Sequence, residues 1–207
     1  MRAMTTSLAL GAVLLTGCVS TQQSLAPIDS SNFELDPTHA FLSASVVHFG
    51  LSNYTIDFTE FDAQLDFQAD EPTTSTISLQ LNPAALDTHY PDAKKKAEWE
   101  DELANDGKFL NAGDFPEVTF VSTSAAQTGE FTGTLTGDLN MRGITAPITL
   151  DIVYTGTATS PLDGGRRRVG FNATGTFNRS DFGITAYSAF VSDEVTLTFT
   201  GEFLESE

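Results

Sequence analysis

Cysteine is almost absent from this chain of 207 residues, since Cys18 is its single copy. One cysteine cannot form a disulfide within the chain, so the domain that follows it must be stable through packing alone. Histidine is scarce as well: His39, His48 and His89 are the three copies, and they lie in separate segments. Without a cysteine beside them or the short spacing of metal ligands, they predict no metal site.

Basic residues are few: 10 Lys and Arg stand against 28 Asp and Glu, which gives a net charge of −18 at pH 7. Phosphate binding needs a basic face, so nucleic acid is not an expected partner. The acidic surplus is typical of a solvated surface that keeps molecules apart, or of a high-salt habitat. Two basic runs, residues 94–96 and 166–168, could contact membrane phosphates, but such runs are more often solvated.

Long apolar runs are missing too. The run Leu8 to Leu15 follows Arg2 and is too short to span a bilayer, which is typical of an export signal. It ends in LTGC at residues 15–18, a tetrapeptide that resembles the lipobox of bacterial lipoproteins. We therefore expect residues 1–17 to be a signal peptide, followed by a lipidated Cys18 and a flexible tether over residues 18–31. The alternative is an ordinary secretory signal with a chance cysteine.

Lipidation would anchor the domain at the periplasmic side of a bacterial membrane, because acyl chains on Cys18 would insert into the bilayer. The next residue is Val19 and not Asp, which favours the outer membrane. The expected location is therefore exported and lipid-anchored.

From Phe33 to Phe203 the chain repeats one pattern, with apolar residues at every second position and turns rich in Gly, Asn and Asp. Period two is typical of strands that have one buried and one solvated face. Many such strands in one chain indicate an antiparallel sheet that closes or folds over. If the sheet closes, its apolar side encloses an interior that can hold a ligand.

The pattern predicts a short strand over residues 33–36 that Pro37 ends, a second over residues 41–49, and one long stretch over residues 54–67. Residues 92–105 lack the alternation and predict a surface helix with Asp92 as its cap. The other expected strands are residues 77–81, 118–122, 130–141, 147–157, 169–178 and 194–203.

Three architectures fit these strands. The polar faces carry Asp and Gln at mid-strand, which is too polar for contact with lipid and argues against a transmembrane pore. A sandwich fits the pattern as well. A soluble barrel of about eight strands has an interior just wide enough for side chains or one slender ligand. Sixteen phenylalanines could either line such a pocket or fill a solid core, and the sequence leaves both open.

Six motifs point to a family. They are FELDPTH at residues 33–39, VVHFGLS at 46–52, FTEF at 58–61, FL and FPEVTF within 109–120, GDLNMRGIT at 137–145 and NRSDFG at 178–183. In order and spacing the chain resembles the YceI-like family over nearly all of residues 32–207. The resemblance implies an all-β, lipocalin-like extended antiparallel barrel of about eight strands with one surface helix. It also implies a periplasmic or secreted protein that binds polyisoprenoid chains, such as prenyl phosphates or quinones, in a long apolar tunnel.

The resulting hypothesis is non-enzymatic binding, transport or sequestration of an isoprenoid lipid, because no nucleophile–base set is evident and the family has no agreed enzymatic activity. The lipid is the expected partner, no cofactor is expected, and a homodimer is possible. The alternative is a structural or interaction lipoprotein with a solid barrel and no ligand. The candidate apolar lining comprises Phe67, Leu79, Leu81, Leu135, Leu150, Ile152, Phe171, Phe177, Leu197 and Phe199.

Three polar side chains are candidates for contact with a head group. His48 is expected either at a strand end, bonded to the backbone, or near a pocket mouth. Arg142 stands at a hairpin tip, where it could meet an anion, although an arginine in this position is more often solvated. Arg179 flanks a turn, where bonds to Asp181 or to the backbone are the competing interpretation.

Overall fold

The computed structural model describes residues 29–159 and 161–207, so the expected signal peptide, Cys18 and most of the tether lie outside the described residues. No described helix is both long and apolar enough to cross a membrane. The strands are β1 (Ser31–His48), β2 (Ser52–Phe58), β3 (Phe61–Phe67), β4 (Thr76–Leu81), β5 (Leu86–Asp87), β6 (Val118–Gln127), β7 (Thr132–Met141), β8 (Ile144–Thr159), β9 (Arg167–Asn178) and β10 (Val191–Glu205). The helix is α1 (Ala93–Asn105), and short 3₁₀ turns are η1 (Pro72–Thr74), η2 (Pro161–Asp163) and η3 (Arg179–Phe182).

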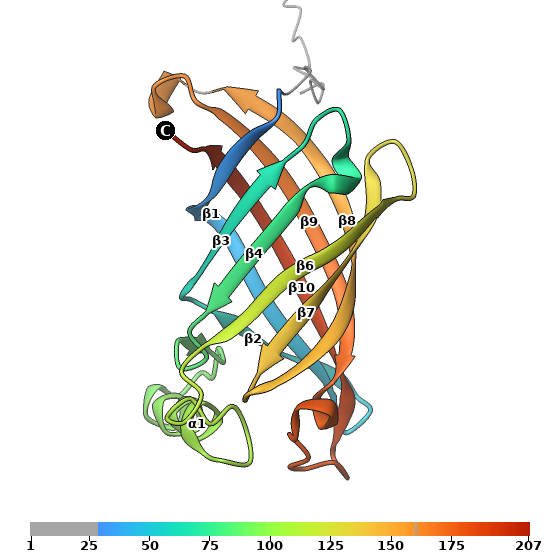
Figure 1. Cartoon of the computed structure of the whole chain (residues 1–207). Coiled ribbons are helices and arrows are strands. Elements are labelled where there is room, and N and C mark those ends of the chain that lie inside the picture. The colour runs from blue at the N-terminus through green and yellow to red at the C-terminus, as the bar shows by residue number, and fades with distance from the viewer. Residues whose placement is uncertain (1–28, 160) are drawn as a thin grey trace, which may run out of the picture.

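The strands form a closed antiparallel barrel (Figure 1). Eight strands follow one another around the ring in the order β10, β9, β8, β7, β6, β4, β3 and β1, and the pairing of β1 with β10 closes it. β2 and β5 extend the sheet beside the second half of β1. The expectation of an all-β, lipocalin-like barrel of about eight strands with one helix is confirmed.

Pro37 does not end the first strand as predicted. β1 runs through it to His48, and its register with β10 shifts between Leu35 and Ala40. A proline removes one backbone donor, and a bulge is the place in a sheet where that donor is not needed. The bulge therefore absorbs Pro37 and bends the strand.

The expected stretch over residues 54–67 is two strands and not one. The bent β1 pairs with β3 along Ser31–Glu34 and with β2 along Leu42–His48, so β2 and β3 share one edge of it. Between them, the amide of Thr59 donates to the carbonyl of Ala85 at 2.9 Å, outside the strand ladder. The chain therefore turns away from the sheet at this point.

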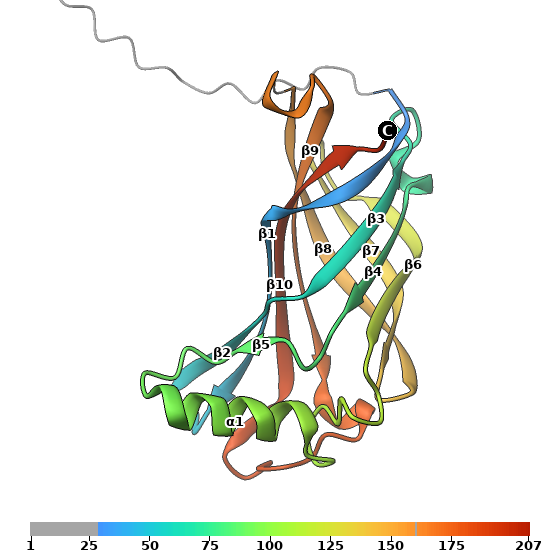
Figure 2. The same cartoon turned by 90° about the vertical axis from the view of Figure 1, so that its left-hand side faces the viewer.

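The predicted helix is present and covers one end of the barrel (Figure 2). Asp92 caps it, since its carboxylate accepts a hydrogen bond from the amide of Lys95 at 2.9 Å. Leu103 and Ala104 are buried against the core, and the indole of Trp99 donates to the hydroxyl of Tyr54 at 2.8 Å. One face of α1 therefore packs onto the interior of the barrel.

The two ends of the barrel differ, as Figures 1 and 2 show. The end that carries α1, the β1–β2 turn and the connection between η3 and β10 is called the helix end below. At the opposite end, called the terminal end, the first and last strands meet: Ser31 donates to Glu205 at 3.0 Å, and the amide of Ser206 donates to the carbonyl of Asn32 at 2.8 Å.

Candidate functional site

The barrel encloses an apolar cavity of about 1030 Å³. This volume is at the upper end of the range for pockets that bind small molecules, which is about 300–1,000 Å³. All ten residues of the predicted apolar lining face it, and they come from six strands of the ring: Phe67, Leu79, Leu81, Leu135, Leu150, Ile152, Phe171, Phe177, Leu197 and Phe199. Their contact with a ligand stays a prediction.

Small residues on the inner face leave this space open. Ala44, Gly133 and Ala173 line the cavity between the larger side chains. Gly175 lets Leu150 lie across its backbone, because a Cβ at Gly175 would stand 2.6 Å from a Leu150 methyl carbon. The aromatic residues therefore line a hollow, and the alternative of a solid core is wrong for this interior.

The cavity reaches the surface at both ends of the barrel. Its lining includes the exposed His48 and Phe49 at the helix end, and the exposed Thr73 and Glu130 at the terminal end. Among the lining residues, His48, Glu130 and Arg179 are the ones that can carry a charge near neutral pH. The arrangement suits a long apolar chain whose polar group remains at one mouth.

The three candidate head-group residues fall in different places. His48 lines the helix end of the cavity, with its ring edge-on to Phe49 at a centroid distance of 4.6 Å. Arg142 is not part of the lining, and its guanidinium donates to the carbonyls of Gly107, at 2.9 Å, and Phe109. Contact between Arg142 and a ligand inside the cavity is therefore not supported.

Arg179 is buried and lines the cavity, but its donors are already taken. Its guanidinium donates to four carbonyls, those of Ser192 at 2.8 Å, Ile184 at 3.3 Å, Ala186 at 2.6 Å and Val191 at 3.2 Å. These bonds hold the connection between η3 and β10 in place. Of the interpretations considered for Arg179, hydrogen bonding to the backbone therefore describes it better than contact with a ligand head group does.

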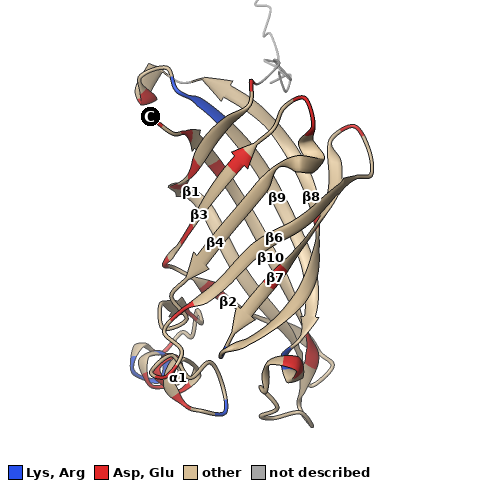
Figure 3. Ribbon diagram, in the orientation of Figure 1, with Lys and Arg blue, Asp and Glu red and all other residues tan. Residues whose placement is uncertain are grey.

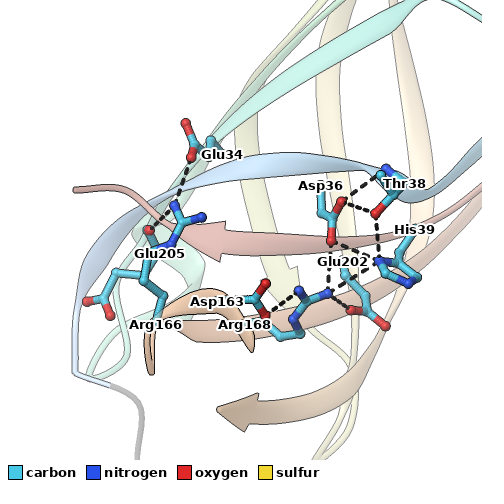
Figure 4. Close-up of polar contacts among 9 residues, drawn as sticks. All are labelled: Glu34, Asp36, Thr38, His39, Asp163, Arg166, Arg168, Glu202 and Glu205. Carbon is cyan, nitrogen blue, oxygen red and sulfur yellow. Dashed lines mark hydrogen bonds and ion pairs between the residues drawn. The ribbon is translucent and has the colours of Figure 1, made fainter. Parts of the chain in front are cut away.

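A cluster of charged side chains that the sequence did not predict lies on the barrel wall near the terminal end (Figure 4). Arg168 on β9 donates to Asp36 at 2.9 Å, to Asp163 at 2.7 Å and to Glu202. Thr38 and His39 also bond to the Asp36 carboxylate, at 2.6 and 2.9 Å.

Asp36 and Arg168 have strongly shifted pKa values. Burial acts to raise the pKa of Asp36, but hydrogen bonds from Thr38, His39 and Arg168 outweigh it and hold that pKa well below its usual range. Burial likewise acts against the charge of Arg168, and its three carboxylates outweigh this and raise its pKa. Both groups therefore stay charged near neutral pH.

The arginine run at residues 166–168 is therefore paired, and the expectation that it is solvated is wrong. Arg166 lies 3.1 Å from Glu34, and Arg167 pairs with Glu205. Strand pairing explains this, because β9 lies beside β10 and β10 beside β1, which brings residues distant in sequence together. The FELDPTH motif at residues 33–39, which contains Asp36 and His39, was the signal available in the sequence.

The same place holds a group of ligand-type side chains. Donor atoms of Asp36, His39 and Glu202 lie within 4.8 Å of one another. Arg168 already sits among them, with Nη1 at 2.9 Å from Asp36 and 3.5 Å from His39. Since its guanidinium supplies the positive charge there, the cluster is an ion-pair network and not an open metal site.

Comparison with known proteins gives consistent matches. A family model described as a YceI-like domain matches residues 33–203. A UPF0312 protein of Pseudomonas syringae pv. syringae is 35% identical over 180 residues, which covers 86% of this chain and 85% of that protein. A UPF0312 protein of Pseudomonas putida GB-1 is 36% identical over the same length and coverage.

Solved structures share the fold. Burkholderia cenocepacia BcnA matches with a TM-score of 0.70 at 19% identity, over 83% of this chain and 99% of that one. A Campylobacter jejuni YceI protein matches with 0.65 at 24% identity, over 78% and 90%. A polyisoprenoid binding domain from Saccharophagus degradans matches with 0.60 at 11% identity, over 86% and 100%.

Proposed function

Because this chain belongs to the YceI-like domain family, we propose that it binds an isoprenoid lipid in the barrel cavity and carries or sequesters it without chemical change. The observation that carries the proposal is the cavity itself, whose apolar lining extends from one end of the barrel to the other. Removing apolar surface from water contributes about 25 cal/mol per Å², from which the cost of association is subtracted. The polyisoprenoid binding domain of S. degradans, which shares the fold, supports the choice of ligand class.

The lining favours an uncharged head group, such as a quinone, over a prenyl phosphate. A phosphate needs free cationic donors. Arg179 has its donors committed to backbone carbonyls, and Glu130 at the opposite mouth would repel an anion. A quinone needs no counter-charge and could accept a hydrogen bond from His48 or a tyrosine at the helix end.

We further propose that the protein acts at the periplasmic face of a membrane, held by lipid on Cys18. The sequence LTGC at residues 15–18 supports this, and Val19 favours the outer membrane. Metabolic labelling with palmitate tests it: wild type should incorporate label and Cys18→Ser should not. Equal labelling of both would contradict the anchor.

The ligand is identified by purifying the protein from a bacterial host, extracting it with organic solvent and analysing the extract by mass spectrometry. An isoprenoid quinone at near-stoichiometric amounts is the expected result. Recovery of no lipid would favour the alternative, a structural or interaction lipoprotein.

Affinity is measured through Trp99, the single tryptophan of the chain, which lines the cavity. Ubiquinone-2 should quench its fluorescence on binding. Ala173→Phe fills part of the cavity and should weaken binding at least tenfold. Val153→Phe places the same ring on the outer wall beside it, where Val153 is 42% exposed, and should bind as wild type. Equal affinity for both variants would exclude the cavity as the site.

A further inference from the structure

Four large apolar side chains are exposed together at the helix end. They are Phe49, Leu51, Tyr187 and Phe190, which are 57%, 87%, 49% and 49% exposed, and together they are called the apolar tip. The tip joins two connections that are far apart in sequence, the β1–β2 turn and the connection between η3 and β10. The ring centroids of Phe49 and Phe190 lie 5.1 Å apart, and the amide of Phe49 donates to the carbonyl of Phe190 at 2.7 Å.

The backbone that carries these side chains is conformationally strained at two of them. Phe49 and Gly50 take left-handed conformations, with φ of 53° and 69°, and the amide of Leu51 donates back to His48 at 3.0 Å to close the turn. Tyr187 is left-handed too, with φ of 57°. Bulky residues are uncommon in this region and are kept where the surrounding structure holds them, which is frequently at functional sites.

The tip carries no charge of its own. Residues 40–56 and 182–192, which contain both connections, have no Asp, Glu, Lys or Arg, although these make up 18% of the chain. The ribbon of both connections is accordingly tan in Figure 3. Lys108 lies beside the tip, with its Nζ 5.9 Å from the centre of the Tyr187 ring, and the buried Arg179 bonds to the carbonyls of Ala186 and Val191 in the same connection. A surface of this kind loses little hydration on entering an apolar medium.

The tip is continuous with the interior. Phe49, Tyr187 and Phe190 are exposed to solvent and also line the cavity. An apolar path therefore leads from the outside of the helix end into the barrel. Large apolar patches on a soluble surface are typical of interaction sites, and aromatic side chains are typical of those that contact the lipid–water interface.

We propose that the apolar tip inserts into a lipid surface, so that the ligand passes between bilayer and cavity without crossing water. This rests on the proposed function: an isoprenoid lipid dissolved in a bilayer must leave the bilayer to reach the cavity. Each methylene group that is exposed to water during this step is unfavourable. A bilayer fits the tip better than a second copy of this chain does, since each copy carries a net charge of −18 and two would repel. Because the same negative charge would repel anionic lipids, the preferred surface is zwitterionic.

The test is the rate at which the full-length protein, loaded with ubiquinone-2, gives the quinone to phosphatidylcholine vesicles. Recovery of Trp99 fluorescence after stopped-flow mixing reports the transfer. The rate of transfer by contact rises in proportion to vesicle concentration, whereas the rate of transfer through water does not depend on it. We expect the first behaviour in wild type.

Two leucines provide the matched comparison. Leu51→Asp in the tip should slow transfer at least fivefold. Leu162→Asp in η2 changes an equally exposed leucine, 94% against 87%, at the terminal end, and should leave the rate unchanged. The affinity for ubiquinone-2 should be unchanged in both variants.

Phe49→Asn separates docking from folding. Asparagine tolerates the left-handed conformation better than any other residue with a Cβ, so the turn should be kept and Tm should stay within about 2 °C. Transfer should nevertheless slow, because the ring is lost.

A rate independent of vesicle concentration, or unchanged in both Leu51→Asp and Phe49→Asn, would overturn the docking proposal while ligand binding stands. Slower transfer that accompanies loss of a dimer in analytical ultracentrifugation would overturn it in favour of a second copy. If ubiquinone-2 does not quench Trp99 at all, the proposed function fails instead.

Discussion

Single side chains on the barrel wall tie together strands that are distant in sequence. Arg168 is the centre of this arrangement, since it joins β9 to Asp36 on β1 and Glu202 on β10. Its Nη atoms are bonded, and Nε is buried without a partner among the described residues. A buried ion pair adds little net stability over an apolar replacement, but removal of one member leaves the other charge uncompensated.

Asp36→Asn should therefore lower the free energy of unfolding at pH 7 by about 2 kcal/mol, less than for an isolated pair because Arg168 keeps Asp163 and Glu202. Urea unfolding followed by circular dichroism measures the change. Asp66→Asn removes an exposed carboxylate on β3 and is the control, with an expected change below about 0.5 kcal/mol.

The same substitution should change the response to acid. The pKa of Asp36 is lower in the folded than in the unfolded chain, so the unfolded state binds its proton first as the pH falls. Its contribution is complete above about pH 4, the unfolded pKa, and is lost below it. Asp36→Asn should therefore make the fall in stability between pH 4 and pH 2 less steep. Part of the fall should remain, because hydrogen bonds from Arg167 and, to a smaller extent, Ser31 lower the pKa of Glu205 to about 2. Parallel curves for wild type and variant would contradict this.

Gly137 shows how closely the inner wall is packed in places. A Cβ there would overlap the Phe120 ring and the Val121 carbonyl, so Gly137→Ala should cost about 1–3 kcal/mol of unfolding free energy. At Gly107 no atom lies within 4 Å of the added carbon, and Gly107→Ala should be neutral within about 0.5 kcal/mol. Similar losses in thermal unfolding for the two variants would show that the overlap is relieved by small shifts.

At the scale of elements, the barrel depends on strands that bend and on one helix that covers an end. Alternation predicts strands and their inner faces because period two is a local property, and all ten predicted lining residues therefore face the cavity. Whether the interior is hollow depends on the circumference of the ring and on which side chains meet across it. Neither can be read from one strand at a time.

The errors at Pro37 and over residues 54–67 share a cause. Two others are separate: β5 was not predicted, and β6 runs to Gln127, past its expected end at residue 122. Inward-facing apolar residues stand at odd positions at Phe33 and Leu35 and at even positions from Leu42 to Val46, and the register shift in β1 lies between them. The phase changes again between Phe58 and Phe61, where β2 ends and β3 begins. A change of phase is thus a signal for a bulge or a break, whereas Pro37 by itself was misleading. The FELDPTH motif contained Asp36, but its pairing with Arg168 had no local signal, because Asp36 and Glu202 come from β1 and β10 and Arg168 from β9.

The cap of α1 gives a prediction that is local to this element. Asp92→Ala should destabilise the first turn by about 1 kcal/mol, because the Lys95 amide loses its acceptor. Hydrogen exchange should speed up in residues 93–97 while the strands of the ring keep their protection. Lys94→Ala, which loses only an exposed contact of 3.7 Å with Glu98, is the control and should leave exchange nearly unchanged. Faster exchange across the whole barrel would mean that α1 and the ring unfold together.

For the whole molecule the dominant property is charge. At −18 the folded chain repels itself, and salt screens this repulsion. We expect Tm to rise by about 2–5 °C between 10 and 300 mM NaCl, and equally in choline chloride if screening is the cause. A fall in Tm would show that weakening of ion pairs such as those of Arg168 outweighs the relief of repulsion.

The closing of the ring by its first and last strands also bears on how the molecule forms. Phe33 on β1 lies opposite Glu205 on β10, so the barrel cannot shut until nearly the whole sequence has been synthesised. Contacts between such distant residues slow folding, and before closure β1 and β9 each present an unpaired edge on which chains aggregate. A polypeptide truncated before β10 would therefore remain open, and proteases could recognise it as incomplete by the strand edges that it exposes.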